Sequence, residues 1–298
     1  MSVTPTVVPA PATGRVRATL REALTGATLV GAILVAVVLI MVVAAPLVAI
    51  HDPVQQDVTH RLAAPVFMPG GTWRHPLGTD GLGRDLWARM VYGLRTSLLI
   101  SVPAVAVAAA LGVLIGIAAG YFGGIVNAIL MRVTDVQMAF PFIILGITLL
   151  SVYSPGPVVL IVVLSLSAWP VYARIIRSIA LVDAGSEYVL AARAMGASHW
   201  RIITRYLLRN VAISMLILST LDVAAVIILE ALLSFLGLGI QPPGMSLGTV
   251  MADGKDYLST GIWWITTMPG VLILITLLGL NLLGDGLQGT FDPRLRRT

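Results

Sequence analysis

Long apolar runs dominate this chain, and short polar segments separate them. Six runs have the length and composition of helices that cross the roughly 30 Å hydrocarbon layer of a bilayer. They predict membrane-spanning helices at residues 27–50, 97–121, 136–153, 158–173, 211–238 and 262–283. The first run is longer than the about 7–15 apolar residues of a signal peptide, so we expect it to be retained as a helix.

The composition favours a membrane protein over a soluble one. Hydrophobic residues make up 57% of the 298 residues and charged residues 11%, whereas a soluble domain carries about 25% charged residues. The net charge of +5 and the pI near 10 do not indicate nucleic-acid binding, because the basic residues flank apolar runs instead of forming one stripe. We therefore expect an all-α, polytopic membrane protein.

Charges beside the apolar runs predict the side of the membrane that each segment occupies. Arg15, Arg17 and Arg21 precede the first run and Asp52 follows it, which places the N-terminus in the cytoplasm. With six spans both termini are cytoplasmic, and about two thirds of the 19 basic residues lie on that side, as the positive-inside bias requires. The predicted layout begins with a cytoplasmic tail (1–26), a first span (27–50) and an extracytoplasmic loop (51–96). A core of five membrane helices (97–287) and a cytoplasmic tail (288–298) follow. The core includes a cytoplasmic loop (186–210) and an extracytoplasmic loop (239–261).

Catalytic motifs are absent from the sequence. There is no cysteine, which excludes disulfides and thiol chemistry. Lys255, the only lysine, lies in Gly254-Lys255-Asp256, without the earlier glycine and the following Ser or Thr of a phosphate-binding P-loop. We therefore expect this chain not to be an enzyme, and to have no catalytic residue, no metal site and no cofactor of its own.

The polar segment at residues 186–210 is the main interruption between apolar runs. Ser186 is placed to cap a helix that begins at Glu187, and Gly196 suits the left-handed position that ends one. Ser198 is placed to cap a second helix, on which the spacing by four of the arginines predicts a basic stripe. The stripe consists of Arg201, Arg205 and Arg209. The pattern alone leaves two alternatives open, a docking surface for a partner and a loop held by lipid phosphates.

Several motifs resemble one family of transporters. The run Ala191-Ala192-Arg193-Ala194-Met195-Gly196 resembles the cytoplasmic "EAA" loop of ATP-binding-cassette importer permeases. The segments HPLGTDGLGRD at 75–85, LSFLGLGIQPP at 233–243, NLLGDGL at 281–287 and DPR at 292–294 resemble the dipeptide/oligopeptide/nickel branch. Their order and spacing over roughly residues 75–294 are similar to the second, "C-type", permease of that branch, and several long motifs in order are more specific than any one motif.

The resemblance implies a type I importer permease fold and a set of partners. It implies a homologous second permease, two ATP-binding-cassette ATPase domains that bind ATP and Mg on other chains, and an extracytoplasmic substrate-binding protein. It further implies that the loop helix couples this chain to the ATPase through Glu187, Ala191, Ala192, Gly196 and Ala197. The acidic position of the motif is Leu190 here and its late proline is Arg209, so a salt bridge at position 190 is not expected.

Two carboxylates lie within the fifth apolar run. Asp222 and Glu230 should face protein or water, because an ionised carboxylate at mid-membrane costs about 3 kcal/mol. The alternatives are a lining of the substrate pathway, a structural contact with the partner permease, and a proton relay. We favour the structural contact, and we place Glu230 nearer the pathway than Asp222.

The first outside loop contains residues that also occur as metal ligands. His75, Asp80 and Asp85 are separated by glycines, which favours a turn in which Asp80 or Asp85 caps a helix from Leu86. The spacing of Leu86, Met90 and Leu94 predicts an amphipathic helix on the outer surface. The resemblance implies that the outside surface meets the binding protein. The residues expected in that contact region are Gly78, Asp80, Arg84, Asp85, Gln241, Pro242 and Pro243.

The function expected from the resemblance is ATP-driven import of di- or oligopeptides across the cytoplasmic membrane. Two other functions remain open on the residues alone. An ion-coupled secondary transporter would use Asp222 or Glu230 for proton coupling and need no ATPase. A non-transporting scaffold subunit would bind partners without substrate-stimulated ATP hydrolysis.

Overall fold

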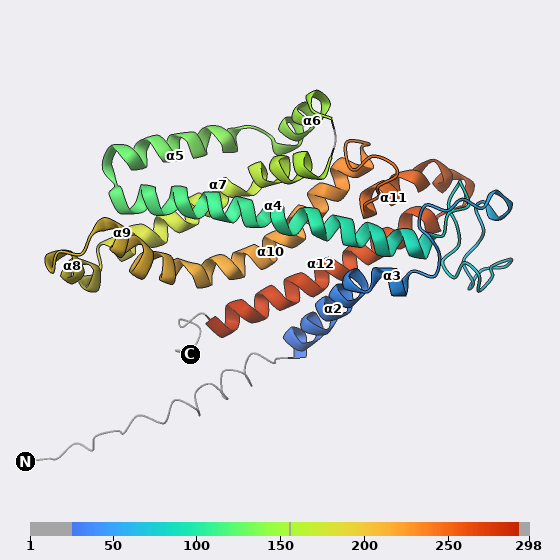
Figure 1. The fold of residues 1–298 in the computed structure, drawn as a ribbon, viewed down its shortest axis with the longest axis horizontal. Coiled ribbons are helices and arrows are strands. Elements are labelled where there is room, and N and C mark those ends of the chain that lie inside the picture. The colour runs from blue at the N-terminus through green and yellow to red at the C-terminus, as the bar shows by residue number, and fades with distance from the viewer. Residues whose placement is uncertain (1–25, 155, 292–298) are drawn as a thin grey trace, which may run out of the picture.

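The computed structural model describes residues 26–154 and 156–291 as an elongated bundle of helices (Figure 1). Within these residues the only pairing of strand type is one isolated bridge between Thr79 and Asp85. The helices are α2 (Gly26–Val43), α3 (Ala45–Val48), α4 (Leu86–Phe122), α5 (Gly124–Ala139), α6 (Phe142–Val152), α7 (Pro157–Ala184), α8 (Glu187–Ala194), α9 (His199–Ile202), α10 (Leu208–Phe235), α11 (Leu247–Gly254) and α12 (Trp264–Phe291). Short elements are the 3-10 helix η1 (Val58–His60), the π-helix η2 (Ile203–Leu207) and the 3-10 helix η3 (Lys255–Thr260).

Five helices of the described chain are long and apolar enough to cross a membrane, and a bent pair supplies a sixth span. The five are α2, α4, α7, the continuous stretch His199–Phe235, and α12. The all-α fold is therefore confirmed, and the six predicted spans are matched when the bent pair counts as one span. Residues 1–25 of the predicted N-terminal tail and 292–298 of the predicted C-terminal tail, with their arginines, lie outside the described residues. The C-terminal tail was predicted to begin at residue 288, but α12 continues to Phe291.

The third span is not the continuous helix predicted for residues 136–153. It consists of α5 and α6, which meet at an angle of 84°. The break falls at Phe140-Pro141, where both residues have extended backbone, because proline disfavours helical geometry in the residue before it. Three other prolines, Pro103, Pro170 and Pro269, lie inside α4, α7 and α12, which continue through them.

Helix α4 corrects the prediction for the outer surface. It runs without interruption from Leu86 to Phe122, so no separate surface helix precedes the second span. Its first turn begins where predicted, because Oδ1 of Asp85 accepts a hydrogen bond of 2.8 Å from the backbone N–H of Ala88. Leu86, Met90 and Leu94 face a buried core shared with α10, α11 and α12 instead of a lipid surface.

Three glycines allow α4 to pack closely against α7. Gly112, Gly116 and Gly120 recur at intervals of four and lie on one face. A Cβ atom at Gly112 would lie 2.2 Å from Cβ of Tyr172, and one at Gly116 would lie 2.7 Å from the carbonyl oxygen of Ala173. This small-residue spacing is typical of helix pairs in membranes. It indicates that α4 and α7 are the closely packed central pair of the bundle.

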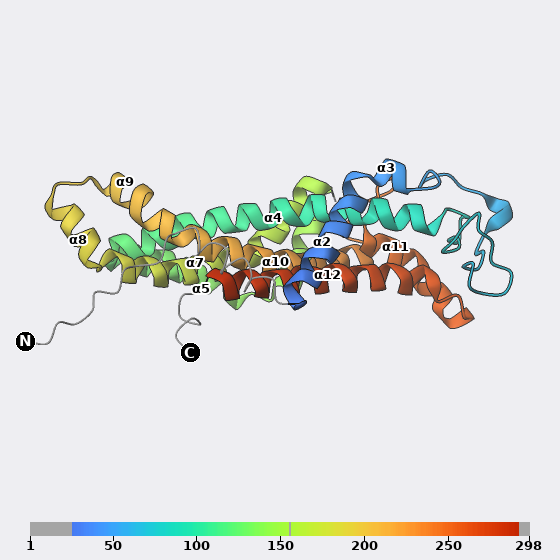
Figure 2. The same ribbon diagram turned by 90° about the horizontal axis from the view of Figure 1, so that it is seen from below.

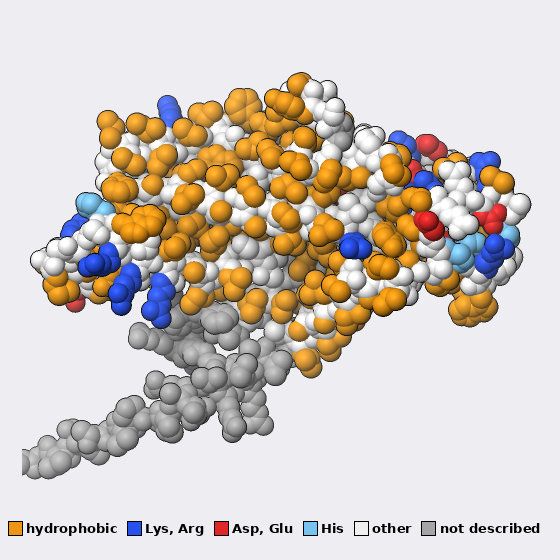
Figure 3. All heavy atoms as spheres, viewed as in Figure 1, with side chains coloured by type: hydrophobic (Ala, Val, Ile, Leu, Met, Phe, Trp, Pro, Cys, Tyr) orange, Lys and Arg blue, Asp and Glu red, His pale blue; other side chains and the backbone are white. Residues whose placement is uncertain are grey.

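The surface of the bundle separates into an apolar middle and two polar ends (Figure 3). Basic side chains gather at the end that carries α8 and α9, and charged side chains of both signs gather at the opposite end. Figure 2 confirms that α8 and α9 lie at one end, while the loop before α4 and η3 lie at the other. Between α5 and α7, Arg174 pairs with Asp135 at 2.6 Å.

Candidate functional site

The polar segment between α7 and α10 forms two short helices joined by a glycine corner. Gly196 has a φ of +82° immediately after α8, as the sequence predicts. Ser198 caps α9 by accepting a hydrogen bond of 3.4 Å from the N–H of Arg201. Ser186 does not cap α8 with its side chain, because its hydroxyl donates to the carbonyl oxygen of Asp183 at 2.5 Å.

This segment, residues 186–210, is tied to the membrane helices by polar contacts. The hydroxyl of Tyr121, at the end of α4, shares a hydrogen bond of 2.7 Å with Nδ1 of His199. The guanidinium of Arg193 lies 5.2 Å from the centre of the Tyr121 ring, a cation–π contact. Asn210 donates a hydrogen bond of 2.6 Å to Asp183 of α7. No local pattern in the sequence predicted these contacts, although Tyr121 ends an apolar run as interfacial tyrosines do.

The face of α8 that remains exposed differs in part from the predicted one. Ala192 is only 2% exposed, so its side chain faces the bundle and is not available to a partner. Leu190, Met195 and Trp200 are 50%, 81% and 76% exposed, and Ala191 is exposed beside them. We call these four residues the coupling face. Of the other residues predicted to couple the chain to the ATPase, Glu187 and Gly196 are exposed and Ala197 is half-buried. The arginine stripe Arg201, Arg205 and Arg209 is exposed as well.

A cavity of about 440 Å³ opens beside the bend between α5 and α6. Its lining is almost entirely apolar and includes Pro141, Phe142, Val171 and Leu229, together with the half-buried carboxylate of Asp222. The hydroxyl of Tyr172 neighbours this carboxylate. The carboxylate of Asp222 is therefore the one group of this otherwise apolar wall that can both accept hydrogen bonds and attract a cation.

Glu230 does not line this cavity, although its neighbour Leu229 does. The side chain of Glu230 is 0% exposed. It accepts hydrogen bonds from Ser97 at 2.7 Å and from Ser234 at 2.6 Å. Ser97 also accepts a hydrogen bond from the backbone N–H of Leu247. Glu230 therefore joins α10, α4 and α11 inside the chain, and its burial leaves it unavailable to a partner permease in this conformation.

Four charged residues connect the outer loop to α11. Asp80 pairs with Arg84 at 2.6 Å and lies 3.4 Å from Nε of Arg89. Asp253 pairs with the same two arginines, at 2.9 Å and 2.7 Å. An adjacent cavity of about 480 Å³ is lined by Arg84, Arg89, Asp253 and the Gln241–Gly244 turn. Such a network fixes the outer loop to the bundle, because removing one partner leaves a buried charge unpaired.

The predicted outer contact region is therefore only partly at the surface. Asp80 and Asp85 are 1% and 2% exposed, and Gly78 is buried. Arg84 is half-buried, and the Gln241–Pro243 turn is exposed. A partner on this side can contact Arg84 and the Gln241–Pro243 turn. The buried residues Gly78, Asp80 and Asp85 instead determine the conformation of the loop.

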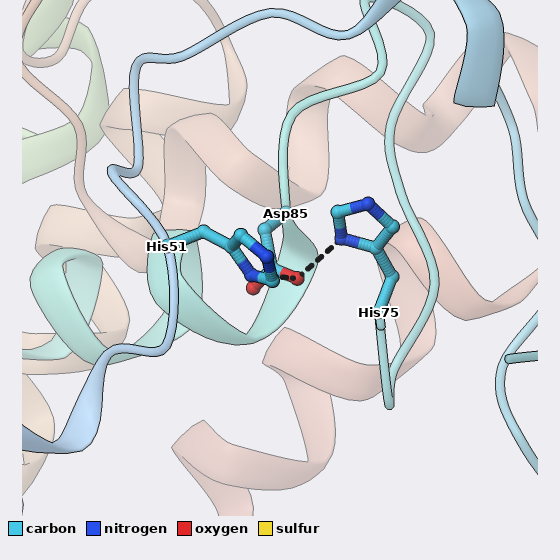
Figure 4. Close-up of side chains that lie close together, drawn as sticks. All are labelled: His51, His75 and Asp85. Carbon is cyan, nitrogen blue, oxygen red and sulfur yellow. Dashed lines mark hydrogen bonds and ion pairs between the residues drawn. The ribbon is translucent and has the colours of Figure 1, made fainter. Parts of the chain in front are cut away.

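Two histidines converge on one aspartate at this outer end (Figure 4). Nδ1 of His75 lies 2.8 Å from Oδ2 of Asp85, and Nδ1 of His51 lies 3.4 Å from the same oxygen. The sequence suggested Asp80 as the third member of this group, but Asp80 belongs to the arginine network and His51, from the end of the first span, takes its place. The separation of 34 residues between His51 and Asp85 gives no local signal of this contact.

His199 belongs to the segment 186–210, and His60 has partners of its own. Nδ1 of His60 lies 2.8 Å from Oδ2 of Asp57. Hydrogen bonds from Thr59 and His60 hold the pKa of Asp57 well below its ordinary value, so this carboxylate stays ionised and keeps His60 engaged. His60 is therefore not part of the group formed by His51, His75 and Asp85.

Comparison with known proteins decides the family. Residues 112–297 match the family described as "Binding-protein-dependent transport system inner membrane component". The chain belongs to this family. It is also 35% identical to the "Di/tripeptide transport system permease protein DppC" of Pseudomonas aeruginosa over 85% of this chain and 83% of that one. It is 45% identical to a "Putative peptide transport system permease protein" of Brucella suis over 77% of each chain.

Further relatives agree with this membership. The chain is 39% identical to the "Dipeptide transport system permease protein DppC" of Bacillus subtilis over 85% of this chain and 77% of that one. A solved structure of the MetNI methionine ABC transporter in inward-facing conformations has a similar fold, with a TM-score of 0.55 and 21% identity, over 68% of this chain and 97% of that one. As an inner-membrane transport component, the chain is a multi-pass membrane protein. The two relatives named DppC agree with the C-type permease of the branch that the motifs predicted.

Proposed function

We propose that this chain is one of two permease subunits of an ATP-driven importer of di- or oligopeptides. Family membership supports the importer, and the names of the similar proteins support the peptide cargo. On this proposal the chain forms half of the pathway and hydrolyses no ATP itself. ATP and Mg bind to two ATPase domains on other chains, and a binding protein delivers the peptide from outside.

The coupling face is the observation that carries the proposal. It lies beyond the apolar surface at the end of the molecule where basic side chains gather (Figure 3). Side chains such as Trp200 and Met195 lie outside the apolar middle of the bundle. Their apolar surface is removed from water only when another protein covers it, so their exposure indicates a binding surface for a partner. We infer that an ATPase cleft covers them, and that the contacts of Tyr121 and Asn210 carry its movement to α4 and α7.

This docking sets the orientation of the chain. The coupling face lies on the cytoplasmic side, where the ATPases are. The start of α2 and the end of α12 lie nearer to α8 and α9 than the opposite ends of the same helices do (Figure 1), which supports two cytoplasmic termini. The loop end with Arg84 and the Gln241–Pro243 turn is then extracytoplasmic and receives the binding protein.

We assign the peptide pathway to the cavity beside the bend between α5 and α6. Asp222 offers a negative charge to the N-terminal ammonium of a peptide, and the apolar wall tolerates different side chains. A charge-assisted hydrogen bond of this kind is worth about 1.5–3 kcal/mol. Glu230 has no part in the pathway on this assignment, because serine hydroxyl groups already satisfy it.

The test is substrate-stimulated ATP hydrolysis by the reconstituted complex. Met195→Asp places a charge in the proposed apolar contact, and Met195→Leu preserves its size and apolarity. Met195 is exposed and appears in no side-chain hydrogen bond or ion pair of the described chain, so both variants should fold and insert. We expect Met195→Asp to lose stimulation by peptide and binding protein, and Met195→Leu to retain it.

A second variant, Gly196→Asp, strains the positive φ of the corner and should also leave an inserted but uncoupled permease. Normal peptide-driven hydrolysis in both Met195→Asp and Gly196→Asp would contradict the assigned coupling face. Transport by the purified chain without any ATPase would instead support ion-coupled transport and refute the importer proposal.

A further inference from the structure

We propose that His51, His75 and Asp85 form a binding site for one divalent transition-metal cation of the Zn²⁺ class. The site lies at the outer end of the molecule, where the segment after α3 meets the N-terminus of α4 (Figure 4). The inference is independent of the cargo and of the coupling face. It concerns a resident cation bound by this chain alone.

The positions of the donor atoms fit such a cation. One ligand atom from each residue lies within 4.8 Å of the others. The oxygen Oδ2 of Asp85 is 2.8 Å from Nδ1 of His75 and 3.4 Å from Nδ1 of His51. Zinc bonds of about 2.0–2.2 Å in a tetrahedron separate neighbouring ligand atoms by about 3.3–3.6 Å. The contact between His51 and Asp85 already has this spacing, and His75 must move away from Asp85 by about half an ångström or more. The three ligand atoms, which lie within 4.8 Å of one another, then close around the ion.

The two carboxylate oxygens of Asp85 have different roles in the proposed site. Oδ1 accepts the backbone N–H of Ala88 and caps α4, which fixes the carboxylate in direction. Oδ2 is directed at both imidazole rings. Ligands held by an outer contact of this kind are pre-oriented for a metal, so the helix cap that the sequence predicted also aims a ligand.

The imidazole of His51 supplies the second observation. Its Nδ1 atom is buried and has no hydrogen-bond partner within the described parts of the chain, although the side chain as a whole is 28% exposed. A buried polar atom without a partner costs about 1–3 kcal/mol. A bound cation would satisfy this nitrogen, and two imidazoles with one carboxylate are donors that suit zinc.

The cation has a route into the site. A cavity of about 470 Å³ is lined by His51, Asp52, Tyr92 and residues of the α3 region. This cavity reaches the site from the His51 side, since neither His75 nor Asp85 lines it. Three protein ligands leave the fourth position of a tetrahedral zinc site to water. The nearby carboxylates do not compete for the cation, because Asp80 is held by two arginines and Asp57 is held by Thr59 and His60.

The bound cation would connect distant parts of the chain. His51 follows the first span, His75 lies in the middle of the outer loop, and Asp85 begins α4. A metal that joins them would close a loop of more than thirty residues, which constrains a long segment for a small ordering cost. Metal binding should therefore protect the outer loop from proteolysis and raise the thermal stability of the chain.

The experiment measures metal binding by the full-length chain, purified in detergent without a polyhistidine tag and stripped with a chelator. Co²⁺ is titrated as a visible probe of coordination and then displaced with Zn²⁺, and metal content is measured after gel filtration. The ligand variants are His51→Gln, His75→Gln and Asp85→Asn, of which the last keeps an oxygen to cap α4. His60→Gln is the matched control, since His60 lies in the same loop with its Nδ1 engaged elsewhere.

We expect one equivalent of Co²⁺ in the wild-type chain and in His60→Gln. Each ligand variant should weaken binding by more than the about 10–100-fold that follows loss of an outer contact to a metal ligand. Zn²⁺ should slow cleavage of the outer loop in the wild type but not in His51→Gln. Absence of a stoichiometric cation in the wild type would overturn the proposal, as would unchanged affinity in His51→Gln, whose partly exposed side chain can be replaced without loss of the fold.

Discussion

Adding one methyl group at Gly112 should separate the two central helices. The added Cβ would lie 2.2 Å from Cβ of Tyr172 and 2.9 Å from the carbonyl oxygen of Trp169. Ordinary contact begins at 3.4 Å, so α7 must move by at least about 1.2 Å in Gly112→Ala. Neither obstructing atom can rotate away, because one is backbone and the other is attached directly to it.

The energies can be compared for this substitution. Overpacking costs about 1–3 kcal/mol, and the short contact at Gly112 favours the upper end. The replacement of glycine by alanine in a helix returns about 1 kcal/mol. We therefore expect Gly112→Ala to lower the free energy of unfolding by about 2 kcal/mol. Gly289→Ala in α12 is the control, because no atom lies within 4 Å of its new Cβ and only the favourable contribution remains.

The assay is thermal unfolding of the purified chain in detergent, followed by the fraction that remains monodisperse after heating. Gly112→Ala should unfold several degrees below the wild type, and Gly289→Ala should unfold at or above it. Equal stability of the two variants would show that α4 and α7 yield easily at this contact. The close-packed interface could then not be the rigid centre of the bundle.

Three further changes test other contacts. Glu230→Ala removes the acceptor of two serine hydroxyl groups and should cost about 1–3 kcal/mol, measured by thermal unfolding, whereas unchanged stability would argue against a structural role. Tyr121→Phe keeps the ring but loses the hydrogen bond to His199, and it should reduce peptide-stimulated ATP hydrolysis with little effect on insertion; full stimulation would show that this contact transmits nothing. Asp222→Asn should raise the KM for free peptides by about 10–100-fold but not for N-acetylated peptides, and an equal rise for both would refute the assigned ammonium contact.

The apolar pattern predicted the number and approximate position of the spans because membrane length and hydropathy set them directly. It failed at the third span, where a break at Phe140-Pro141 turns the helix by 84°. A proline in a membrane helix is compatible with both a continuous and a broken helix, and Pro103, Pro170 and Pro269 lie inside helices that continue. The pattern therefore located the segment but could not give its course.

The corner at Gly196 followed from local chemistry alone, since only glycine adopts a positive φ without strain. Local chemistry did not decide which small residue faces the partner, and Ala192 turned out to be buried. Neighbours on α4, α7 and α10 determine this face, and their positions depend on contacts distant in sequence. The same limit applies to Glu230 and to the meeting of His51 with Asp85, which no local pattern encodes.

Helix α4 spans nearly the whole molecule, from the cap at Asp85 to the contact between Tyr121 and His199. Its 37 residues correspond to a rod of about 55 Å. Geometry makes such a rod a lever arm, since a tilt of one degree about one end displaces the other by about 1 Å. A rotation of one degree at the Asp85 end of α4 therefore shifts the Tyr121 end by about the distance that rearranges a hydrogen bond, and the converse holds for a rotation that begins at the end near α8 and α9.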